Sequence, residues 1–215
     1  MKISQGVTEG GVQIGNHYNK YETRNFIAQY LMNNFTKSLD DLVNQTGKRS
    51  IFEVGCGEGF WSLRWLNQGF QIKACDFSEA AIAMAKSNAI EMHLDSSVFF
   101  TKSIYELSKD NETDLIVCCE VLEHLEYPEL ALSKLSNIAN PWLILSVPRE
   151  PIWSWMNMAR GKYWSDLGNT PGHIQRWSQK EFIEMVKGYF DVVEIRAPLP
   201  WTMLLCKSRT PQQRD

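Results

Sequence analysis

Residues 53–60 combine an acidic side chain with glycines in a spacing that suits ligand binding. They read Glu-Val-Gly-Cys-Gly-Glu-Gly-Phe, so Gly55, Gly57 and Gly59 alternate with other residues shortly after Glu53. Glycine permits backbone torsions that a side chain forbids, and it lets the main chain come into contact with a ligand. Because the segment leads from an expected strand into an expected apolar helix, it predicts a site for a nucleotide-type cofactor.

The spacing of the glycines also bears on the kind of ligand. A dinucleotide fingerprint reads Gly-x-Gly-x-x-Gly and places a pyrophosphate at the N-terminus of the helix, whereas here the third glycine comes one residue early. Glu58 would also put negative charge beside such a phosphate, at the positive end of the helix dipole. We therefore expect a cationic ligand that carries no phosphate.

The segment resembles the first motif of the class I S-adenosylmethionine-dependent methyltransferases. The resemblance implies that Glu53 serves the ammonium end of the methionine part of the cofactor. It also implies that the glycine loop contacts the cofactor through Gly55, Cys56, Gly57 and Gly59. S-adenosylmethionine is therefore the expected cofactor.

A second acidic residue, Asp76, follows the apolar run of residues 71–75. It lies about twenty residues beyond the glycine loop, where a ribose-binding carboxylate belongs in nucleotide-binding folds. The alternative is that Asp76 merely ends a strand and, with Ser78, caps the following helix. With the glycine loop upstream, we predict that Asp76 binds the ribose.

Two later segments extend the resemblance. Residues 98–103 predict a strand whose end would lie beside the adenine, and Ser103 stands where the family usually has an acidic residue. Residues 113–120 predict a buried strand, and the Val-Leu-Glu-His-Leu sequence of residues 121–125 resembles the family's fourth motif. From these motifs the resemblance implies further cofactor contacts by Phe77, Ser103, Ile104, Cys119 and Glu120.

The order of the expected elements indicates the fold. Strands alternate with helices at residues 50–54, 71–76, 98–103, 113–120 and 142–147. This alternation implies parallel strands joined by right-handed crossovers. Two further strands, residues 191–196 and 201–207, are separated by only four residues and must pair antiparallel. The predicted fold is α/β, a Rossmann-like doubly wound, mostly parallel seven-stranded sheet with a C-terminal antiparallel hairpin, an arrangement typical of class I methyltransferases.

We expect one domain over residues 1–215, because this length and a 44% hydrophobic composition suit a single core. Its expected parts are a helical segment at 16–45, a cofactor-binding core at 50–148, an insertion at 149–177, and the last helix with the hairpin at 178–208. In the family a segment like the first often closes over the cofactor, which makes Tyr21 the expected contact, with Arg24 beside it. The alternative is a plain amphipathic helix.

The amino-acid composition indicates which kinds of binding partner are expected. A net charge of −3 lacks the basic excess of most duplex-binding surfaces, which makes nucleic acid an unlikely partner. The five cysteines include no Cys-x-x-Cys pair, so neither a disulfide framework nor a zinc ribbon is expected. No apolar run reaches membrane-spanning length, and residues 1–15 do not have the form of a signal peptide. We expect a cytoplasmic protein, either a monomer or a homodimer.

The insertion at residues 149–177 is expected to select the substrate. It holds four of the eight tryptophans and is longer than a usual connection, and long connections tend to be functional. Aromatic and methionine side chains on a cover suit an apolar or planar acceptor. Trp153 and Trp177 are the expected acceptor contacts, and Arg149 could meet an anionic group. The alternative is a satellite core or a dimer face.

Methyl transfer from a sulfonium is an in-line displacement, so the protein needs alignment and at most one base. His124, in the fourth motif, and His173 are the candidate bases, because imidazole titrates near neutrality. Either would take a proton from an acceptor hydroxyl. The alternatives are a structural histidine that bonds the loop backbone and a loop histidine without a role.

The spacing of Glu120, Glu123 and His124 would bring them to one side of a helical turn, and with His173 they form a possible ligand set for Mg²⁺ or Mn²⁺. The set resembles that of metal-dependent methyltransferases acting on the 2′-hydroxyl at small-RNA 3′ ends. Against that family, Arg176 replaces an expected acidic residue. The fourth motif is also common in metal-free relatives, including O-methyltransferases of quinone biosynthesis, and we expect no metal.

The function expected from the sequence is S-adenosylmethionine-dependent methylation of a small-molecule acceptor, on oxygen or possibly nitrogen, under an aromatic lid. A metal-dependent RNA 3′-terminal 2′-O-methyltransferase is the first alternative. A subunit that binds S-adenosylmethionine without turnover is the second. The acceptor itself cannot be named, because this part of the fold varies most freely.

Overall fold

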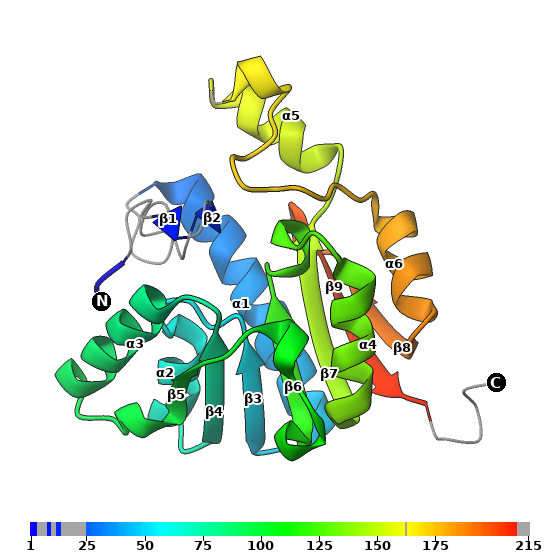
Figure 1. The fold of residues 1–215 in the computed structure, drawn as a ribbon. Coiled ribbons are helices and arrows are strands. Elements are labelled where there is room, and N and C mark those ends of the chain that lie inside the picture. The colour runs from blue at the N-terminus through cyan, green and yellow to red at the C-terminus, as the bar shows by residue number, and fades with distance from the viewer. Residues whose placement is uncertain (4–7, 10–11, 14–24, 162, 210–215) are drawn as a thin grey trace.

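The computed structural model describes residues 1–3, 8–9, 12–13, 25–161 and 163–209 (Figure 1). Tyr21 and Arg24, with the start of the expected helical segment, lie outside the described residues. The first long helix, α1 (Phe26–Thr46), begins where the side-chain oxygen of Asn25 accepts a hydrogen bond from the Ala28 amide at 3.0 Å. Asparagine is a preferred residue at this position, because it satisfies an amide that the helix leaves without a partner.

Seven strands form one sheet in the order β5-β4-β3-β6-β7-β9-β8. The predicted doubly wound fold with a C-terminal hairpin is confirmed. The parallel strands are β3 (Ser50–Val54), β4 (Gln71–Asp76), β5 (Phe99–Thr101), β6 (Thr113–Cys119) and β7 (Ala139–Pro148). The antiparallel strands are β9 (Trp201–Ser208), which pairs with β7, and β8 (Phe190–Arg196). A separate antiparallel pair joins β1 (Thr8–Glu9) to β2 (Val12–Gln13).

Two strands end earlier than the sequence predicts, each for a local reason. Strand β5 stops at Thr101 because Ser103 starts the 3-10 helix η2 (Ile104–Glu106), accepting from the Tyr105 amide at 3.3 Å. Strand β6 stops at Cys119 because Glu120 turns into the left-handed region, with a φ of 59°. Both turns lie at the carboxyl ends of their strands, where the expected cofactor site is located.

Helices cover both faces of the sheet (Figure 1). Besides α1, the helices are α2 (Phe60–Asn67), α3 (Glu79–Glu91), α4 (Pro128–Ile138), α5 (Ile152–Ala159) and α6 (Gln179–Lys187). Alternate strand residues point to opposite faces, so Leu115 and Val117 of β6 join the core beneath α1, α2 and α3, while Ile116 and Cys118 join the core beneath α4 and α6. Helix α5 stands above the end of the sheet, outside the two layers.

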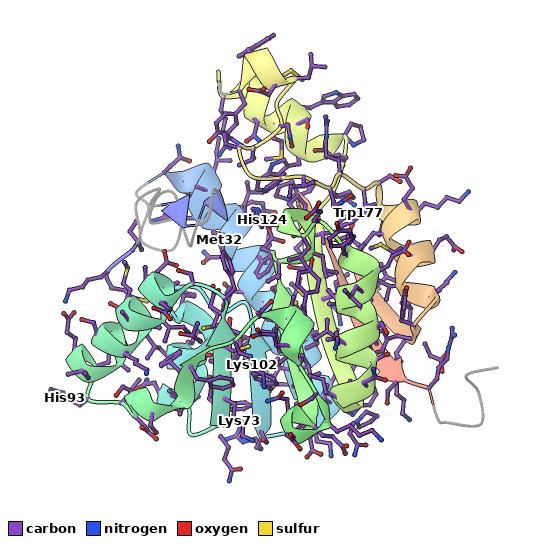
Figure 2. The ribbon with its side chains drawn as sticks, viewed as in Figure 1. Met32, Lys73, His93, Lys102, His124 and Trp177 are labelled. Atoms are coloured by element: carbon purple, nitrogen blue, oxygen red, sulfur yellow. The ribbon has the colours of Figure 1, made fainter. Side chains whose placement is uncertain are left out.

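The carboxyl ends of the parallel strands meet at one end of the sheet, below α5. Figure 2 shows His124 and Met32 at this end, whereas Lys73 lies at the opposite end. Helix α6 begins with the predicted capping box, in which the Glu181 carboxylate accepts from the Ser178 amide at 2.8 Å. This cap fixes the point at which the chain returns from the insertion to the sheet.

Candidate active site

A cavity of about 1000 Å³ lies at the carboxyl ends of β3, β4 and β6. One half is walled by the loops that follow these strands. The other half is walled by α1, by the insertion and by the start of β9. In open parallel sheets ligands bind outside the carboxyl ends of the strands, and this cavity occupies that place.

The glycine loop packs tightly against the turn after β6. The amides of Gly55 and Cys56 donate to the Cys75 carbonyl at 2.8 and 3.0 Å, which folds the loop over the end of β4. Gly55 has a φ of 79°, and a Cβ atom there would lie 2.2 Å from Cγ2 of Val121. The loop and the fourth-motif turn therefore fit together only with glycine at this position.

Gly59 has a different environment from the other glycines of the loop. With a φ of 83° it precedes α2, and a Cβ atom there would meet the Phe99 ring at 2.9 Å and Ala85 at 3.1 Å. Among the described residues Gly55, Cys56 and Gly57 line the cavity, and Gly59 does not. The structure therefore gives Gly59 a packing environment, and its predicted contact with a cofactor stays a prediction.

Glu53, the last residue but one of β3, lies beneath the loop and is buried. Its carboxylate accepts from the Ser62 amide at 3.0 Å and from the Ser62 hydroxyl, near the start of α2. Burial raises the pKa of Glu53 to about 8, although the two bonds from Ser62 lower it. Near neutral pH this carboxyl is therefore poised between its two protonation states, a common property of functional sites.

Asp76 combines the two roles that its sequence position allows. It lines the cavity, and it accepts from the Gly57 amide at 2.9 Å and from the Ser78 amide at 3.0 Å. Burial raises the pKa of Asp76, opposed by these two bonds. Ser78 caps α3 through the Ala81 amide. The neighbouring cavity wall includes the other predicted cofactor contacts Phe77, Ser103, Ile104, Cys119 and Glu120.

The two candidate bases, His124 and His173, contact each other in the cavity wall. Their imidazole rings meet edge to face at 4.9 Å, and Nδ1 of His124 bonds the Gly172 carbonyl at 2.8 Å. Because a carbonyl only accepts, Nδ1 carries the proton in this bond, and a neutral His124 ring then has its basic lone pair on Nε2. Ligand atoms of Glu123, His124 and His173 all lie within 4.8 Å of one another.

Glu120, the fourth member of the possible metal set, has other partners. One carboxylate oxygen accepts from the Ser146 hydroxyl at 3.0 Å, and the other accepts from the Trp201 indole at 2.6 Å. The structure thus brings three of the four predicted ligands together. The i, i+3, i+4 spacing assumes that Glu120 belongs to the same helical turn as the other two residues. Glu120 instead has a left-handed φ and lies before η4 (Leu122–His124).

Aromatic rings form one wall of the cavity. Trp201 contacts Phe35 at 5.0 Å and Trp153 at 5.9 Å between ring centroids, and Trp153 stacks on His173 at 5.8 Å. Phe35 in turn contacts Trp61 at 5.7 Å. Phe35, Trp61 and Trp201 line the cavity although the sequence does not indicate it, because apolar residues in helices and strands are typical of a core.

The other predicted acceptor contacts lie elsewhere. Within the described residues neither Trp177 nor Arg149 lines the cavity. These two residues form a β-bridge with each other, and the Trp177 ring packs on Phe182 of α6 at 5.8 Å. The capped start of α6 draws Trp177 toward the sheet, so it supports the base of the insertion.

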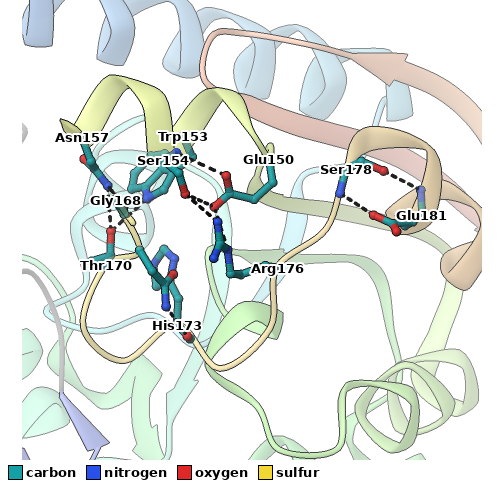
Figure 3. A network of polar contacts seen from close by, with 11 residues as sticks. Glu150, Trp153, Ser154, Asn157, Gly168, Thr170, His173, Arg176, Ser178 and Glu181 are labelled. Atoms are coloured by element: carbon teal, nitrogen blue, oxygen red, sulfur yellow. Dashed lines mark hydrogen bonds and ion pairs between the residues drawn. The ribbon is translucent and has the colours of Figure 1, made fainter. Parts of the chain in front are cut away.

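A polar network holds the insertion together (Figure 3). Glu150 accepts from the hydroxyl of Ser154 at 2.8 Å and pairs with Arg176 at 3.4 Å. Asn157 donates to the Gly168 carbonyl at 2.9 Å, and Trp153 donates to the Thr170 hydroxyl at 2.9 Å. These bonds tie α5 to the returning chain and fix the Trp153 ring that faces the cavity.

The returning chain is also bonded to the fourth-motif turn. The amides of Ile174 and Gln175 both donate to the Glu123 carbonyl, at 2.9 and 3.0 Å, and the Gln175 side chain donates to the Leu125 carbonyl at 3.2 Å. His173 is therefore fixed against His124 by backbone contacts on both sides.

A helix that crosses a membrane must be both long and apolar. None of the helices in the described part of the chain meets both requirements.

The sequence of residues 17–194 matches a family described as "Methyltransferase domain". The chain belongs to this methyltransferase family. The match covers most of the chain, and with the sheet order it confirms the predicted class, an S-adenosylmethionine-dependent methyltransferase of class I. It is an enzyme family, and S-adenosylmethionine is the cofactor.

Curated relatives share only part of their length with the chain. A ubiquinone biosynthesis O-methyltransferase of Rickettsia conorii is 33% identical over 91 residues, which cover 40% of the chain and 30% of that protein. The Marinobacter nauticus protein of the same name is 30% identical over 120 residues, covering 53% and 50%. The chain thus spans between 30% and 50% of the length of these relatives.

Solved structures share the fold at low identity. Magnesium protoporphyrin IX methyltransferase of Synechocystis PCC 6803 aligns with a TM-score of 0.66 at 19% identity, covering 87% of this chain and 89% of that one. The PH0226 protein of Pyrococcus horikoshii aligns at 0.70 with 14% identity, covering 89% and 95%. The methyltransferase domain of bacterial CtHen1 aligns at 0.63 with 21% identity, covering 82% and 99%.

Proposed function

We propose that this methyltransferase transfers a methyl group to a hydroxyl oxygen of a small-molecule acceptor. The observation that carries the proposal is the His124–His173 pair, which lies between the cofactor half of the cavity and its aromatic wall. A base at that junction suits an acceptor hydroxyl, which must lose its proton on methylation. The curated relatives named as O-methyltransferases support the choice of oxygen.

The cofactor half has the shape and chemistry for S-adenosylmethionine. The glycine loop has no room for a Cβ at Gly55 and presents its backbone to the cavity. Asp76 would bind the ribose hydroxyls, and Glu53 would serve the methionine ammonium. Phe77, Ser103 and Ile104 would flank the adenine, and the backbone of Cys119 and Glu120 would lie near the methionine end.

When bound, S-adenosylmethionine supplies an electrophilic methyl group and a neutral sulfur leaving group. His124 is held by the Gly172 carbonyl with Nε2 as its basic atom, and His173 lies beside it. One imidazole takes the proton of the acceptor hydroxyl as the oxygen becomes bonded to carbon. The aromatic wall excludes water from this junction and holds the acceptor in line, which supplies much of the rate.

The same wall suggests the nature of the acceptor. We place a planar or apolar body against Trp153 and Trp201, in preference to Trp177 and Arg149, because only the first pair lines the cavity. Arg160 also lines it and is the cation that would meet an anionic substituent. We further propose a cytoplasmic location, supported by five cysteines that form no disulfide.

The test is turnover by metal-stripped protein with S-adenosylmethionine and catechol, a small planar dihydroxy compound, as the probe acceptor. The proposal expects methylated catechol in the presence of a chelator, with an equal amount of S-adenosylhomocysteine. Loss of either His124 or His173 should lower this turnover, and His93→Ala is the matched control that should not, since His93 is exposed and lies far from the cavity (Figure 2). Binding of S-adenosylmethionine without product across a panel of hydroxylated acceptors would contradict the proposal.

A second candidate is the metal-dependent methylation of an RNA 3′-terminal 2′-hydroxyl. The observation in its favour is the grouping of Glu123, His124 and His173 within 4.8 Å, a donor set that suits Mn²⁺. The bonds of Glu120 to Ser146 and Trp201 weigh against a four-ligand site. This candidate expects activity on a short RNA that a chelator abolishes and Mn²⁺ restores.

A further inference from the structure

Glu120 is a non-glycine residue held in a left-handed backbone conformation, with a φ of 59°. Such a conformation is strained for a residue with a side chain and persists where the surroundings fix it, often at functional sites. Here the surroundings are visible. The Glu120 amide donates to the Ser146 carbonyl at 3.0 Å, the Ser146 hydroxyl bonds one carboxylate oxygen, and Trp201 bonds the other.

The turn at Glu120 sends successive side chains to opposite halves of the cavity. Val121 lies against Gly55, where a Cβ atom would be 2.2 Å from it, so this residue contacts the cofactor loop. Glu120 instead reaches Trp201 at the start of β9, in the acceptor half. The conformation of one residue therefore joins the two halves of the site.

The bond from Trp201 to Glu120 determines how the indole lies. An indole has a single donor, and a buried indole needs a partner for it; Trp201 is 5% exposed. A bond to a carboxylate is shorter and stronger than a bond to a neutral acceptor, and this one measures 2.6 Å. From Trp201 ring contacts continue to Trp153 at 5.9 Å and from Trp153 to His173 at 5.8 Å.

We propose that Glu120 is a positioning residue for the acceptor: its carboxylate orients Trp201, and through Trp201 it sets the place of Trp153 beside His173. This role differs from a metal ligand and from a cofactor contact through the side chain. The inference rests on the proposed function where it concerns the acceptor. Its structural part, the dependence of Trp153 on Glu120, does not.

The kinetic test compares variants with catechol as the probe acceptor. We expect Glu120→Ala to raise the KM for catechol at least tenfold while the Kd for S-adenosylhomocysteine changes less than twofold. Trp201→Phe keeps a ring but removes the donor and should have the same effect, with the double variant no worse than the worse single one. Glu120→Gln should recover most of the loss, because its amide can accept from Trp201 and donate to Ser146.

Glu120→Asn provides a second variant if Glu120→Ala fails to fold, since asparagine tolerates the left-handed conformation and is too short for both bonds. Two results would overturn the proposal. In one, Glu120→Gln is as damaging as Glu120→Ala, which would assign the role to the negative charge. In the other, the Kd for S-adenosylhomocysteine rises as much as the KM, which would make Glu120 a cofactor ligand.

A spectroscopic arm decides the case even if catechol is not methylated. In protein labelled with ¹⁵N-tryptophan, the indole resonance of Trp153 should shift in Glu120→Ala, because Glu120 acts on Trp153 through Trp201. The Trp201 indole proton should exchange with solvent at least tenfold faster. An unchanged Trp153 resonance contradicts the positioning role, whereas absent turnover with a shifted resonance contradicts the proposed function alone.

Discussion

At the scale of single residues, the ionisation of Glu53 is coupled to folding. Its pKa in the folded protein is about 8, against an ordinary value of 4.5, because burial disfavours the charged form. Between these two values the folded protein holds a proton that the unfolded chain has released. The contribution of Glu53 to stability is therefore fully present below about pH 4.5 and falls until about pH 8.

We expect Glu53→Gln to remove this dependence. Glutamine accepts the Ser62 bonds without titrating. As the pH rises, the unfolding free energy of the variant should therefore increase relative to that of the wild type. The slope should be about 1.4 kcal/mol per pH unit at most between pH 5 and 8. Urea unfolding at several pH values measures it, and parallel curves for the two proteins would show that Glu53 is ionised in the fold.

At the same scale, the histidine pair should carry the proton transfer. His173→Ala and His124→Ala are each expected to lower kcat by about 100-fold, at the low end for loss of a general base, with the Kd for S-adenosylhomocysteine within about twofold. His93→Ala is the matched control for removing an imidazole. A variant that raises only the KM would indicate that the histidine binds the acceptor without taking its proton.

At the scale of elements, the glycine loop and the fourth-motif turn form one packed unit. Gly55 touches Val121, and Gly69 has nearly the same φ, 78° against 79°, with nothing within 4 Å of a Cβ atom. The two positions therefore separate backbone strain from a steric clash. Both alanine variants carry the left-handed penalty, and only one meets a neighbour.

We expect Gly69→Ala to destabilise the protein by about 1 kcal/mol, the cost of a left-handed alanine. Gly55→Ala should cost at least about 1 kcal/mol more, because overpacking adds to the strain, and it should weaken S-adenosylhomocysteine binding. Urea unfolding and calorimetric titration measure both effects. Equal losses of stability for the two variants would mean that Val121 moves aside without cost.

The elements also show what the sequence could and could not predict. Alternating apolar residues and short connections sufficed for the strands and for the antiparallel hairpin, because these signals act locally. Trp177 is expected from the sequence at the acceptor and instead packs against Phe182 of α6, since the path of the insertion depends on contacts such as the bridge to Arg149. The bond of Glu120 to Trp201 joins residues 81 positions apart, a separation that no local pattern reveals.

For the whole molecule, the cavity wall is rich in carboxylates. Its cationic members among the described residues, apart from the histidines, are Lys102 and Arg160. The acidic members are Glu53, Glu58, Asp76, Glu106, Glu120, Glu123 and Glu126. Such a wall favours a ligand with positive charge over one with several phosphates.

We therefore expect S-adenosylhomocysteine, the neutral product, to raise the melting temperature of metal-stripped protein and NAD to leave it unchanged. Ligand at about one hundred times its Kd adds roughly 2.7 kcal/mol of stability. S-adenosylmethionine, with one more positive charge, should bind less tightly as salt increases. A melting temperature that rises with NAD, or an additional rise on adding Mn²⁺, would favour a different ligand or the metal-dependent alternative.

The order of the strands in the sheet has a consequence for folding during synthesis. Strand β9 lies between β7 and β8, so β8 is synthesised before the strand that joins it to the sheet. Folding during synthesis starts from the N-terminal side. The glycine loop and Asp76 therefore leave the ribosome before Trp201 does. The residues of the cofactor half are thus all synthesised before β9, whose first residue, Trp201, completes the acceptor half.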